Sequence, residues 1–263
     1  MQYQFGDQDL AARRLEVVAR VFETTTRELL QRVRPSRTRM AVDLGCGPGF
    51  TTRLLAEVLG CDHVAGLDTS ERFLGMAREQ SDARLRFHRH DVLVTPFPEG
   101  PSELIFCRYL LSHLPDPRLC LDSWATQLAT GGLLVVEEVE AIDTTHPAFA
   151  RYLSIVDSML RSQKTELYVG PVLDKLGEGP LLRRLHSRTR RLPVSNRDAA
   201  TMFSMNVPNW KDRPFIRETY GDDSIGKLGA ELDSLAGGAG SESEIVWTLR
   251  QIVFERRAES RTT

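Results

Sequence analysis

The hydrophobic and polar positions of this chain follow two periods, one typical of buried strands and one typical of amphipathic helices. Apolar residues recur at helical spacing across residues 10–33, and Pro35 ends that segment. Short apolar runs then predict five strands, at residues 40–44, 63–67, 85–90, 104–107 and 133–139. Helical patterns between these runs predict helices at residues 50–59, 71–80 and 117–129.

This order predicts a doubly wound α/β fold, in which helices cover both faces of a mainly parallel sheet. After about residue 140 the rhythm changes to a helix over 147–163, a strand over 185–194 and a last long strand over 245–255. We therefore expect residues 1–263 to form a single domain with three parts. These are an N-terminal helical cap (1–35), a core (36–140), and further cap helices with the last two strands (141–263).

Charge and composition exclude few functions. The chain has 41% hydrophobic and 27% charged residues and a net charge of −2, so electrostatics gives no reason to expect nucleic acid as a partner. Five arginines between residues 183 and 191 run against that average. We interpret them as a solvated face of a strand or helix, with a polyanion site as the alternative.

The four cysteines form no CxxC pair and no cluster with histidine; they are Cys46, Cys61, Cys107 and Cys120. Because each lies in or beside an apolar segment, we expect buried free thiols and a reducing compartment. Residues 1–14 lack the apolar core of a signal peptide, and no apolar run reaches membrane-spanning length. We expect a cytoplasmic protein with no membrane partner, and no convergent set of metal ligands is evident.

A glycine-rich turn with the sequence VDLGCGPG occupies residues 42–49, between a predicted strand and a predicted helix. In an open α/β sheet, ligands bind at this edge, where glycines let them approach the backbone closely. A dinucleotide site would have the pattern GxGxxG. Here Gly49 comes one position too early, and Asp43 precedes Gly45 by two residues.

Acidic residues stand at three neighbouring strand ends. Besides Asp43, Asp68 follows the second strand, where it could hold a ribose, and Asp91 follows the third, where a carboxylate could read an adenine amino group. This set favours a cationic adenosine compound over a pyrophosphate. Asp43 alone is also explained by a structural role in the turn, and Asp91 by an ordinary polar strand end.

These segments resemble the class I S-adenosylmethionine-dependent methyltransferases of the small-molecule type. VDLGCGPGFTTRLL is similar to the first motif of that family, GLDTSERFLGMAR to the second, and HRHDV to its adenine-contact segment. FCRYLLSHLPDP and LATGGLLVVEE resemble the fourth and fifth strands with their surroundings, and residues 3–22 resemble the N-terminal helix that covers the cofactor. The resemblance implies a seven-stranded sheet in the order 3-2-1-4-5-7-6, with strand seven antiparallel.

The resemblance also implies a cofactor site for S-adenosyl-L-methionine. In it the three glycines would border the methionine and ribose groups, Asp68 would accept the ribose hydroxyls, and Asp91 with the Val92 amide would contact adenine. The Arg108 backbone would meet the ammonium group, and Arg14 the carboxylate. The full set expected to bind the cofactor is Arg14, Asp43, Gly45, Cys46, Gly47, Gly49, Asp68, Thr69, Asp91, Val92 and Arg108.

Two residues are candidates for a general base, which the reaction needs only if the acceptor must lose a proton early. His113 is expected opposite the substrate side, and a satisfied histidine at a loop–helix junction explains it equally well. Glu138 belongs to a Glu137–Glu138 pair that is expected to end the fifth strand, with one member facing the cleft. Four apolar residues could line a lid over the substrate or simply pack in the core: Met202, Phe203, Met205 and Trp210.

We therefore expect in-line methyl transfer to the oxygen, nitrogen or carbon of a small-molecule metabolite, with a homodimer left open. One alternative is an RNA or DNA methyltransferase, which rests on the arginine run alone. Another is a protein that binds the cofactor without transferring its methyl group. A nicotinamide-dependent oxidoreductase fits least, because the glycine spacing is wrong for it.

Overall fold

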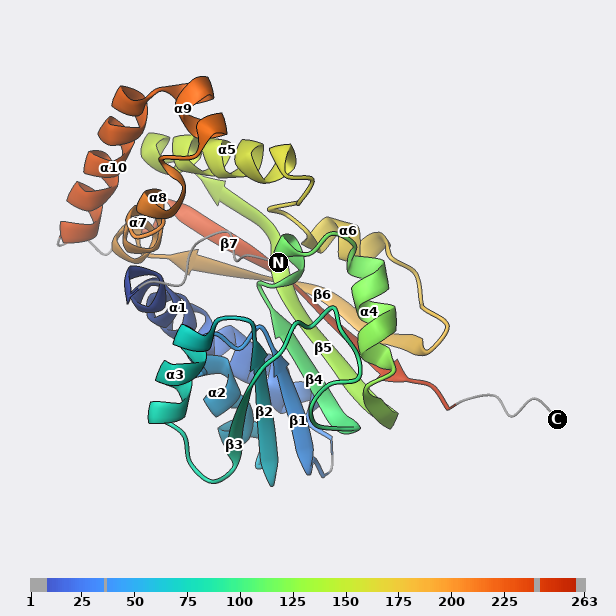
Figure 1. Cartoon of the computed structure of the whole chain (residues 1–263). Helices are drawn as coiled ribbons and strands as arrows, with labels where there is room; N and C mark the ends of the chain where they lie inside the picture. Colours follow the sequence, from blue (N-terminus) through green and yellow to red (C-terminus); the bar gives the residue numbers. More distant parts are fainter. Residues whose placement is uncertain (1–8, 36, 239–241, 259–263) are drawn as a thin grey trace.

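A seven-stranded sheet runs through the molecule in the order β3-β2-β1-β4-β5-β7-β6 (Figure 1). The computed structural model describes residues 9–35, 37–238 and 242–258, so residues 1–8 of the expected N-terminal cap lie outside it. The strands are β1 (Met40–Leu44), β2 (His63–Asp68), β3 (Leu85–Arg89), β4 (Ser102–Arg108), β5 (Leu128–Thr144), β6 (Leu182–Val194) and β7 (Ile245–Arg256). The predicted strand order is confirmed.

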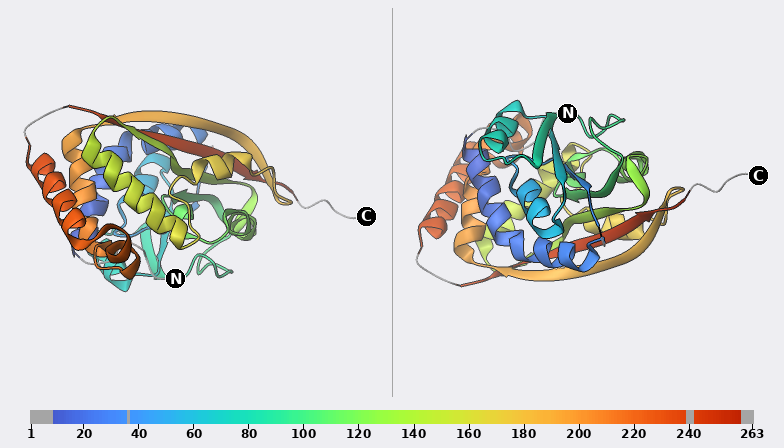
Figure 2. Two further views of the ribbon diagram at one scale, coloured as in Figure 1. Left: turned by 90° about the horizontal axis from the view of Figure 1, so that it is seen from above. Right: turned by 90° about the horizontal axis from the view of Figure 1, so that it is seen from below.

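The pairing of the strands puts their carboxyl ends at one edge of the sheet. β1 pairs in parallel with both β2 and β4, β2 with β3, and β4 with β5. β7 runs antiparallel between β5 and β6, as the resemblance implied. Figure 2 shows the long β6–β7 pair curving along one side of the molecule. The turns that follow β1, β2 and β4 therefore meet at one place.

Two apolar layers cover the two faces of the sheet. Ala41 and Val42 are neighbours in β1 and face opposite sides, as the period-two geometry of a strand requires. The side of Ala41 packs against α1 (Asp9–Val33), α2 (Phe50–Leu59) and α3 (Glu71–Glu79). The side of Val42 packs against α4 (Pro117–Ala125) and the short α6 (Gly170–Lys175), which the sequence pattern did not predict.

A third apolar cluster lies beyond the carboxyl edge of the sheet and joins helices to the ends of β5 and β7. These helices gather on one side in both views of Figure 2; they are α5 (Pro147–Ser162), α7 (Asn196–Ser204), α8 (Val207–Trp210), α9 (Pro214–Tyr220) and α10 (Asp222–Gly237). Two of them have a side-chain cap: at the start of α5 the His146 side chain accepts from the Ala148 amide, and at the start of α7 the Ser195 hydroxyl accepts from the Asp198 amide. The helix expected over residues 147–163 is found as α5.

The segment around Gly131 and Gly132 differs from its prediction. The glycine pair was expected to separate a helix ending at residue 129 from a strand beginning at 133. Instead α4 ends at Ala125 and β5 begins at Leu128, with both glycines inside the strand. A Cβ at Gly132 would lie 2.8 Å from the Ala129 carbonyl oxygen and 3.0 Å from that of Ser102. The glycine therefore lets β5 approach β4 where their register shifts.

Most of the arginine run on β6 is occupied by interactions within the chain. Arg183 forms an ion pair with Glu255, Arg184 with Asp174, and Arg190 with Glu28, while Arg188 donates to the Gln251 side chain. Among the described residues, every helix is too short or too polar to cross a membrane.

Candidate functional site

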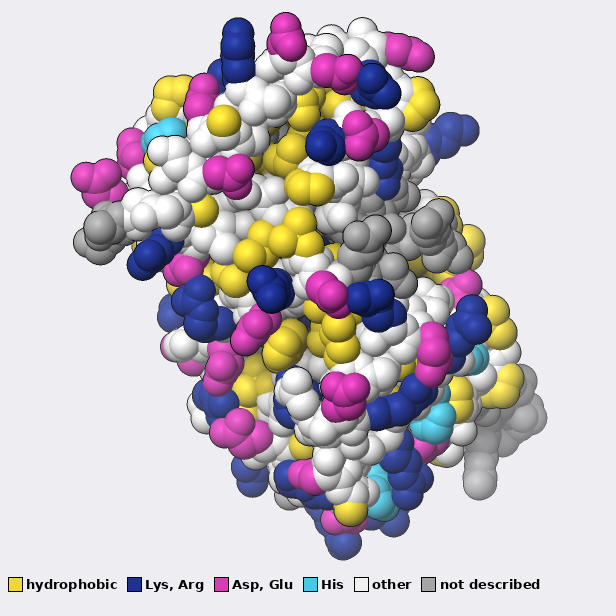
Figure 3. Space-filling model, turned by 60° about the vertical axis from the view of Figure 1, so that its left-hand side comes forward, with side chains coloured by type: hydrophobic (Ala, Val, Ile, Leu, Met, Phe, Trp, Pro, Cys, Tyr) yellow, Lys and Arg dark blue, Asp and Glu magenta, His cyan; other side chains and the backbone are white. Residues whose placement is uncertain are grey.

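A cavity of about 260 Å³ opens where the carboxyl ends of β1, β2 and β4 face the helices beyond the sheet. Hydrophobic side chains gather in the hollow between these two parts of the surface (Figure 3). Its wall has two different regions. One follows the glycine turn and the strand ends, and the other is formed by apolar side chains of α1, α5, α7, β5 and β7.

The glycine turn supplies the floor of the first region. Gly47 lines the cavity with a φ of 51°, a conformation that L side chains rarely adopt. Gly49 has a φ of 80° but does not line the cavity. A Cβ there would lie 3.0 Å from both the Ala77 Cβ and the Phe87 ring, so Gly49 allows α2 to pack against α3 and β3. Of these two glycines, Gly47 therefore faces the cavity and Gly49 serves the packing of the helices.

Asp68 and Asp91 stand beside this turn. The Asp68 carboxylate accepts from the Gly47 amide and from the Ser70 amide, each at 2.8 Å, and so ties the two turns together. Asp91 Oδ1 accepts from the Leu93 amide at 3.0 Å. Ten of the thirteen residues predicted from the sequence line the cavity: Arg14, Gly45, Cys46, Gly47, Asp68, Thr69, Asp91, Val92, Arg108 and His113.

Asp43, the third acid, lies beneath the turn and not in the cavity wall. It is 2% exposed and accepts from the Thr52 hydroxyl at 2.7 Å. Burial raises its pKa to about 7, against the opposing effects of the Thr52 hydrogen bond and the Arg108 charge. The position of Asp43 agrees with the structural interpretation of this residue and not with direct contact to a ligand.

Glu138 does not line the cavity either, although it was a candidate base. Its Oε1 accepts from the amides of Leu110 and Leu111 at 2.7 and 2.8 Å, so it holds the loop after β4. Burial raises its pKa to about 7. The expectation that Glu137 or Glu138 ends the fifth strand and faces the cleft is wrong, because β5 continues to Thr144 and neither carboxylate lines the cavity.

A buried polar network that the sequence pattern did not reveal surrounds Glu137. The carboxylate accepts from the Thr26 hydroxyl at 2.5 Å and from the Gln251 amide at 2.7 Å. The Arg108 guanidinium donates to Thr26 at 2.9 Å and to Thr51 at 3.2 Å. These residues come from α1, α2, β4, β5 and β7, and no local spacing relates them. The Arg108 side chain is therefore held by the protein itself.

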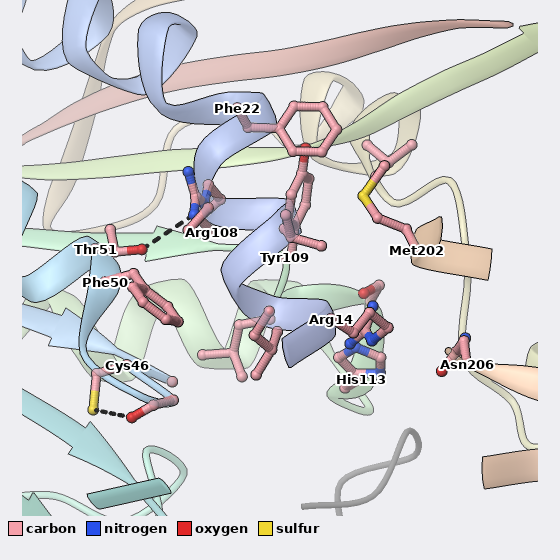
Figure 4. A pocket seen from close by; sticks show the side chains of 18 of the residues that line it. Arg14, Phe22, Cys46, Phe50, Thr51, Arg108, Tyr109, His113, Met202 and Asn206 are labelled. Carbon is pink, nitrogen blue, oxygen red and sulfur yellow. Dashed lines mark hydrogen bonds between the residues drawn. The ribbon is translucent and has the colours of Figure 1, made fainter. Parts of the chain in front are cut away.

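His113 lies in the short helix η1 (Leu111–His113) and in the wall of the cavity. Arg14 from α1 lines the cavity beside it (Figure 4). Burial, and secondly the charge of Arg14, lowers the pKa of His113 to about 4. His113 is therefore a neutral imidazole near pH 7, which can form hydrogen bonds but is a weak base.

Aromatic and aliphatic side chains form the second region of the wall. Tyr152 stacks on Phe203 with ring centroids 3.9 Å apart, and Phe22 meets Tyr109 edge-on at 5.2 Å. We name this region the apolar chamber; its lining residues are Val18, Phe22, Tyr109, Val139, Ile142, Tyr152, Leu153, Val156, Leu160, Leu167, Met202, Phe203, Asn206 and Trp247. Met202 and Phe203 thus face the cavity as the lid hypothesis supposed, whereas Met205 and Trp210 do not.

The described ranges contain no group of three or more His, Cys, Asp or Glu side chains placed to hold a metal ion. The charged groups in the cavity wall are the carboxylates of Asp68 and Asp91 beside the glycine turn and the guanidinium groups of Arg14 and Arg108. Carboxylates suit the hydroxyl and amino groups of a nucleoside and would repel a pyrophosphate. The two carboxylates therefore suit a ligand that offers hydroxyl and amino groups, as a nucleoside does.

Comparison with known proteins agrees with this arrangement. Residues 41–132 match the family model described as "Methyltransferase domain". The trans-aconitate 2-methyltransferase of Methylobacterium radiotolerans is 42% identical over 110 residues, which are 42% of this chain and 42% of that protein. The corresponding enzyme of Rhizobium leguminosarum is 38% identical over 111 residues, 42% of this chain and 43% of that protein. The chain thus spans about two fifths of the length of these curated relatives.

Two solved structures share the fold. Coclaurine N-methyltransferase, bound to N-methylheliamine and SAH, superposes with a TM-score of 0.55 at 14% identity, covering 89% of this chain and 72% of that one. Phosphoethanolamine N-methyltransferase 2 of Haemonchus contortus, in complex with S-adenosyl-L-methionine, gives a TM-score of 0.53 at 17% identity, covering 93% and 57%. At this identity the likeness concerns the fold.

Proposed function

We propose that this chain, which carries a domain of the class I S-adenosylmethionine-dependent methyltransferase family, transfers a methyl group to a small molecule held in its cavity. The observation that supports the proposal best is the continuity of the cavity. The same wall joins the glycine turn and its acids to the apolar chamber, so a cofactor and an acceptor can lie side by side. The wall draws on all three predicted parts of the chain, which supports one functional unit.

The cofactor would lie along the strand ends. Gly45 and Gly47 would border its methionine and ribose groups, Asp68 would accept the ribose hydroxyls, and Asp91 with the Val92 amide would contact the adenine. Asp68 is fixed for this task, because both of its oxygens already accept from backbone amides. Arg14 lines the same cavity and would pair with the carboxylate of the cofactor.

The mechanism that fits this site is direct in-line displacement. When bound, the cofactor supplies a methyl group that its sulfonium already activates. The new bond forms from the acceptor atom to that methyl while the bond to sulfur breaks. The residues of the cavity need only align the two molecules and keep water out. The enclosed apolar chamber suits both tasks, whereas Glu138 is not placed to accept a proton there.

We do not propose the substrate named for the curated relatives as the acceptor of this chain. Trans-aconitate is a tricarboxylate, and the similarity to enzymes named for it covers only 42% of this chain. Each carboxylate buried in the chamber would need a cation to offset its desolvation. The chamber side chains carry no charge among the described residues, so we propose a small acceptor of a different polarity.

Two other functions agree less well with the structure. A nucleic-acid methyltransferase would need an open basic surface, and four arginines of the β6 run are engaged within the chain. A protein that binds the cofactor without transferring methyl would have no use for a chamber beside it. The four cysteines are buried free thiols, which supports a reducing compartment such as the cytoplasm.

Calorimetry with S-adenosylmethionine and S-adenosylhomocysteine tests the cofactor site. We expect micromolar binding that Asp68→Ala weakens at least tenfold, because the charged hydrogen bonds to ribose are lost. Asp68→Asn, which keeps one acceptor oxygen, should lose less. Asp62→Ala, at an exposed position in the turn before β2, is the matched control and should bind normally. If neither compound binds to the wild type, the proposed function is wrong.

A further inference from the structure

The apolar chamber contains one polar side chain that is buried and only half used. Asn206 lies between α7 and α8, is 2% exposed and lines the cavity. Its Nδ2 donates to the Tyr152 hydroxyl at 2.7 Å, which fixes the orientation of the carboxamide. Its Oδ1 is buried and accepts no hydrogen bond from the described residues. Native proteins rarely leave a buried acceptor in that state, because the loss of hydration is costly.

A second polar atom faces the same space. The Tyr109 hydroxyl is buried and makes no hydrogen bond within the described ranges. Tyr109 has a φ of 55°, a strained conformation for a tyrosine, and this directs its ring against Phe22 at the chamber wall (Figure 4). Two polar atoms thus stand in an apolar surface that is otherwise built to hold hydrocarbon.

The charged side chains of the cavity wall lie outside the apolar chamber as defined, although the Arg108 guanidinium lies 5.7 Å from the centroid of the Tyr109 ring. Among the described lining residues, charged or titratable acid, arginine and histidine side chains occur only before position 114; they are Arg14, Asp68, His90, Asp91, Arg108 and His113. Arg108 is held by the Thr26 and Thr51 hydroxyls. Arg108 thus borders the chamber at Tyr109 but is engaged by these hydroxyls, and the described chamber side chains themselves carry no charge that would offset a buried anion.

Aromatic side chains form much of the wall of the apolar chamber. Four rings form a continuous row of contacts. The centroid distances along this row are 5.9 Å from Phe22 to Trp247, 5.7 Å from Trp247 to Phe203, and 3.9 Å from Phe203 to Tyr152. Aromatic walls of this kind pack well against a flat apolar ring.

We propose that the methyl acceptor is an uncharged, ring-bearing molecule whose hydroxyl or amine group donates a hydrogen bond to Asn206 Oδ1. This inference rests on the proposed function for the act of methylation, and on the chamber itself for the class of ligand. Asn206 is a specificity-determining residue in this scheme, and Tyr152 is the positioning residue that aims its carboxamide into the chamber.

Three probes of similar size test the proposal on protein saturated with S-adenosylhomocysteine, which prevents turnover. They are 2-naphthol, which is a neutral donor, 2-methylnaphthalene, which lacks the donor, and 2-naphthoate, which is an anion. Binding is followed by isothermal titration calorimetry. We expect 2-naphthol to bind at least tenfold more tightly than either of the others.

Two variants connect that ranking to Asn206. Asn206→Leu should weaken 2-naphthol about tenfold and leave 2-methylnaphthalene unchanged, whereas Asn209→Leu, in α8 but outside the cavity wall, should change neither. Tyr152→Phe keeps the ring and removes only the oxygen that holds Asn206, so it should reduce the same preference if Asn206→Leu does not fold.

The proposal is overturned if 2-naphthoate binds as tightly as 2-naphthol, or if folded Asn206→Leu and Tyr152→Phe both retain the wild-type preference. Failure of the proposed function looks different. In that case S-adenosylhomocysteine itself does not bind, and the probes are ranked on the protein without it.

Discussion

Glu138 offers a decisive test of whether a buried carboxylate serves the fold or the reaction. The change is Glu138→Gln, which keeps the side-chain shape and an oxygen that can accept from the Leu110 and Leu111 amides. What it removes is ionisation. Burial raises the pKa of this carboxyl from 4.5 to about 7. The folded protein therefore holds a proton that the unfolded chain releases.

The sign of the effect follows from that difference. A group whose pKa is raised on folding stabilises the protein fully below its unfolded pKa, and this stability is lost as the pH rises through the folded value. Each pKa step of one corresponds to about 1.4 kcal/mol. Between pH 5 and pH 8.5 the wild type should thus lose roughly 2 to 3 kcal/mol of unfolding free energy relative to Glu138→Gln.

Urea unfolding at pH 5, 7 and 8.5 measures this difference directly. The matched control is Glu218→Gln in α9, where the side chain is exposed, and its curve should stay parallel to that of the wild type. Parallel curves for Glu138→Gln would refute the reasoning, because they would mean that Glu138 ionises as easily in the folded state as in the unfolded state.

Turnover of the same variant separates the two roles of Glu138. Since this carboxylate does not line the cavity, Glu138→Gln should retain methyl transfer within about threefold at pH 7. A general base would contribute on the order of a hundredfold or more. A loss of that size in a stably folded variant would return Glu138 to the reaction.

Two further predictions follow from the site. Burial holds the pKa of His113 at about 4, so His113 should not titrate between pH 6 and 8, and the pH profiles of wild-type turnover and of His113→Gln should have the same shape there; an inflection present only in the wild type would contradict this. Gly66 in β2 faces Phe87, whose ring would lie 2.7 Å from an added Cβ, so Gly66→Ala should destabilise the protein by about 1 to 3 kcal/mol in urea unfolding. Gly75→Ala in α3, where an added Cβ meets nothing within 4 Å, is the control and should be neutral or stabilising; equal stability of the two variants would mean that the Gly66 contact relaxes freely.

The half of the cavity that we propose for the cofactor could be predicted because its residues stand at the ends of strands that the sequence pattern identifies. Gly45, Gly47 and Asp68 lie at strand ends, and parallel pairing brings those ends together wherever the strands are correctly found. The same reasoning could not tell Gly47 from Gly49. Gly47 faces the cavity and Gly49 faces Ala77 and Phe87, and only the packing of α3 and β3 decides between them.

The features that the sequence pattern missed or placed wrongly depend on contacts between residues far apart in the chain. The network around Glu137 joins Thr26 and Gln251, which are separated from it by 111 and 114 positions, and nothing in the local spacing relates the three. β5 was predicted to end at residue 139, with Glu137 and Glu138 near its end, yet it continues to Thr144 and both carboxylates are buried with hydrogen-bond donors. A polar residue marks the end of a strand only if the fold supplies it no partner.

The residues of the apolar chamber also could not be identified from the sequence pattern. Periodicity identifies Met202, Phe203 and Trp210 as buried, but a side chain that faces a cavity and one that faces the core have the same pattern. The structure separates them: Met202 and Phe203 line the cavity, whereas Trp210 packs behind it. The polar residue Asn206 is more informative than these, since a buried carboxamide with a free oxygen has no reason to exist in a core. Substrate preference in this chain is therefore better sought in the few polar atoms of the chamber than in its many apolar ones.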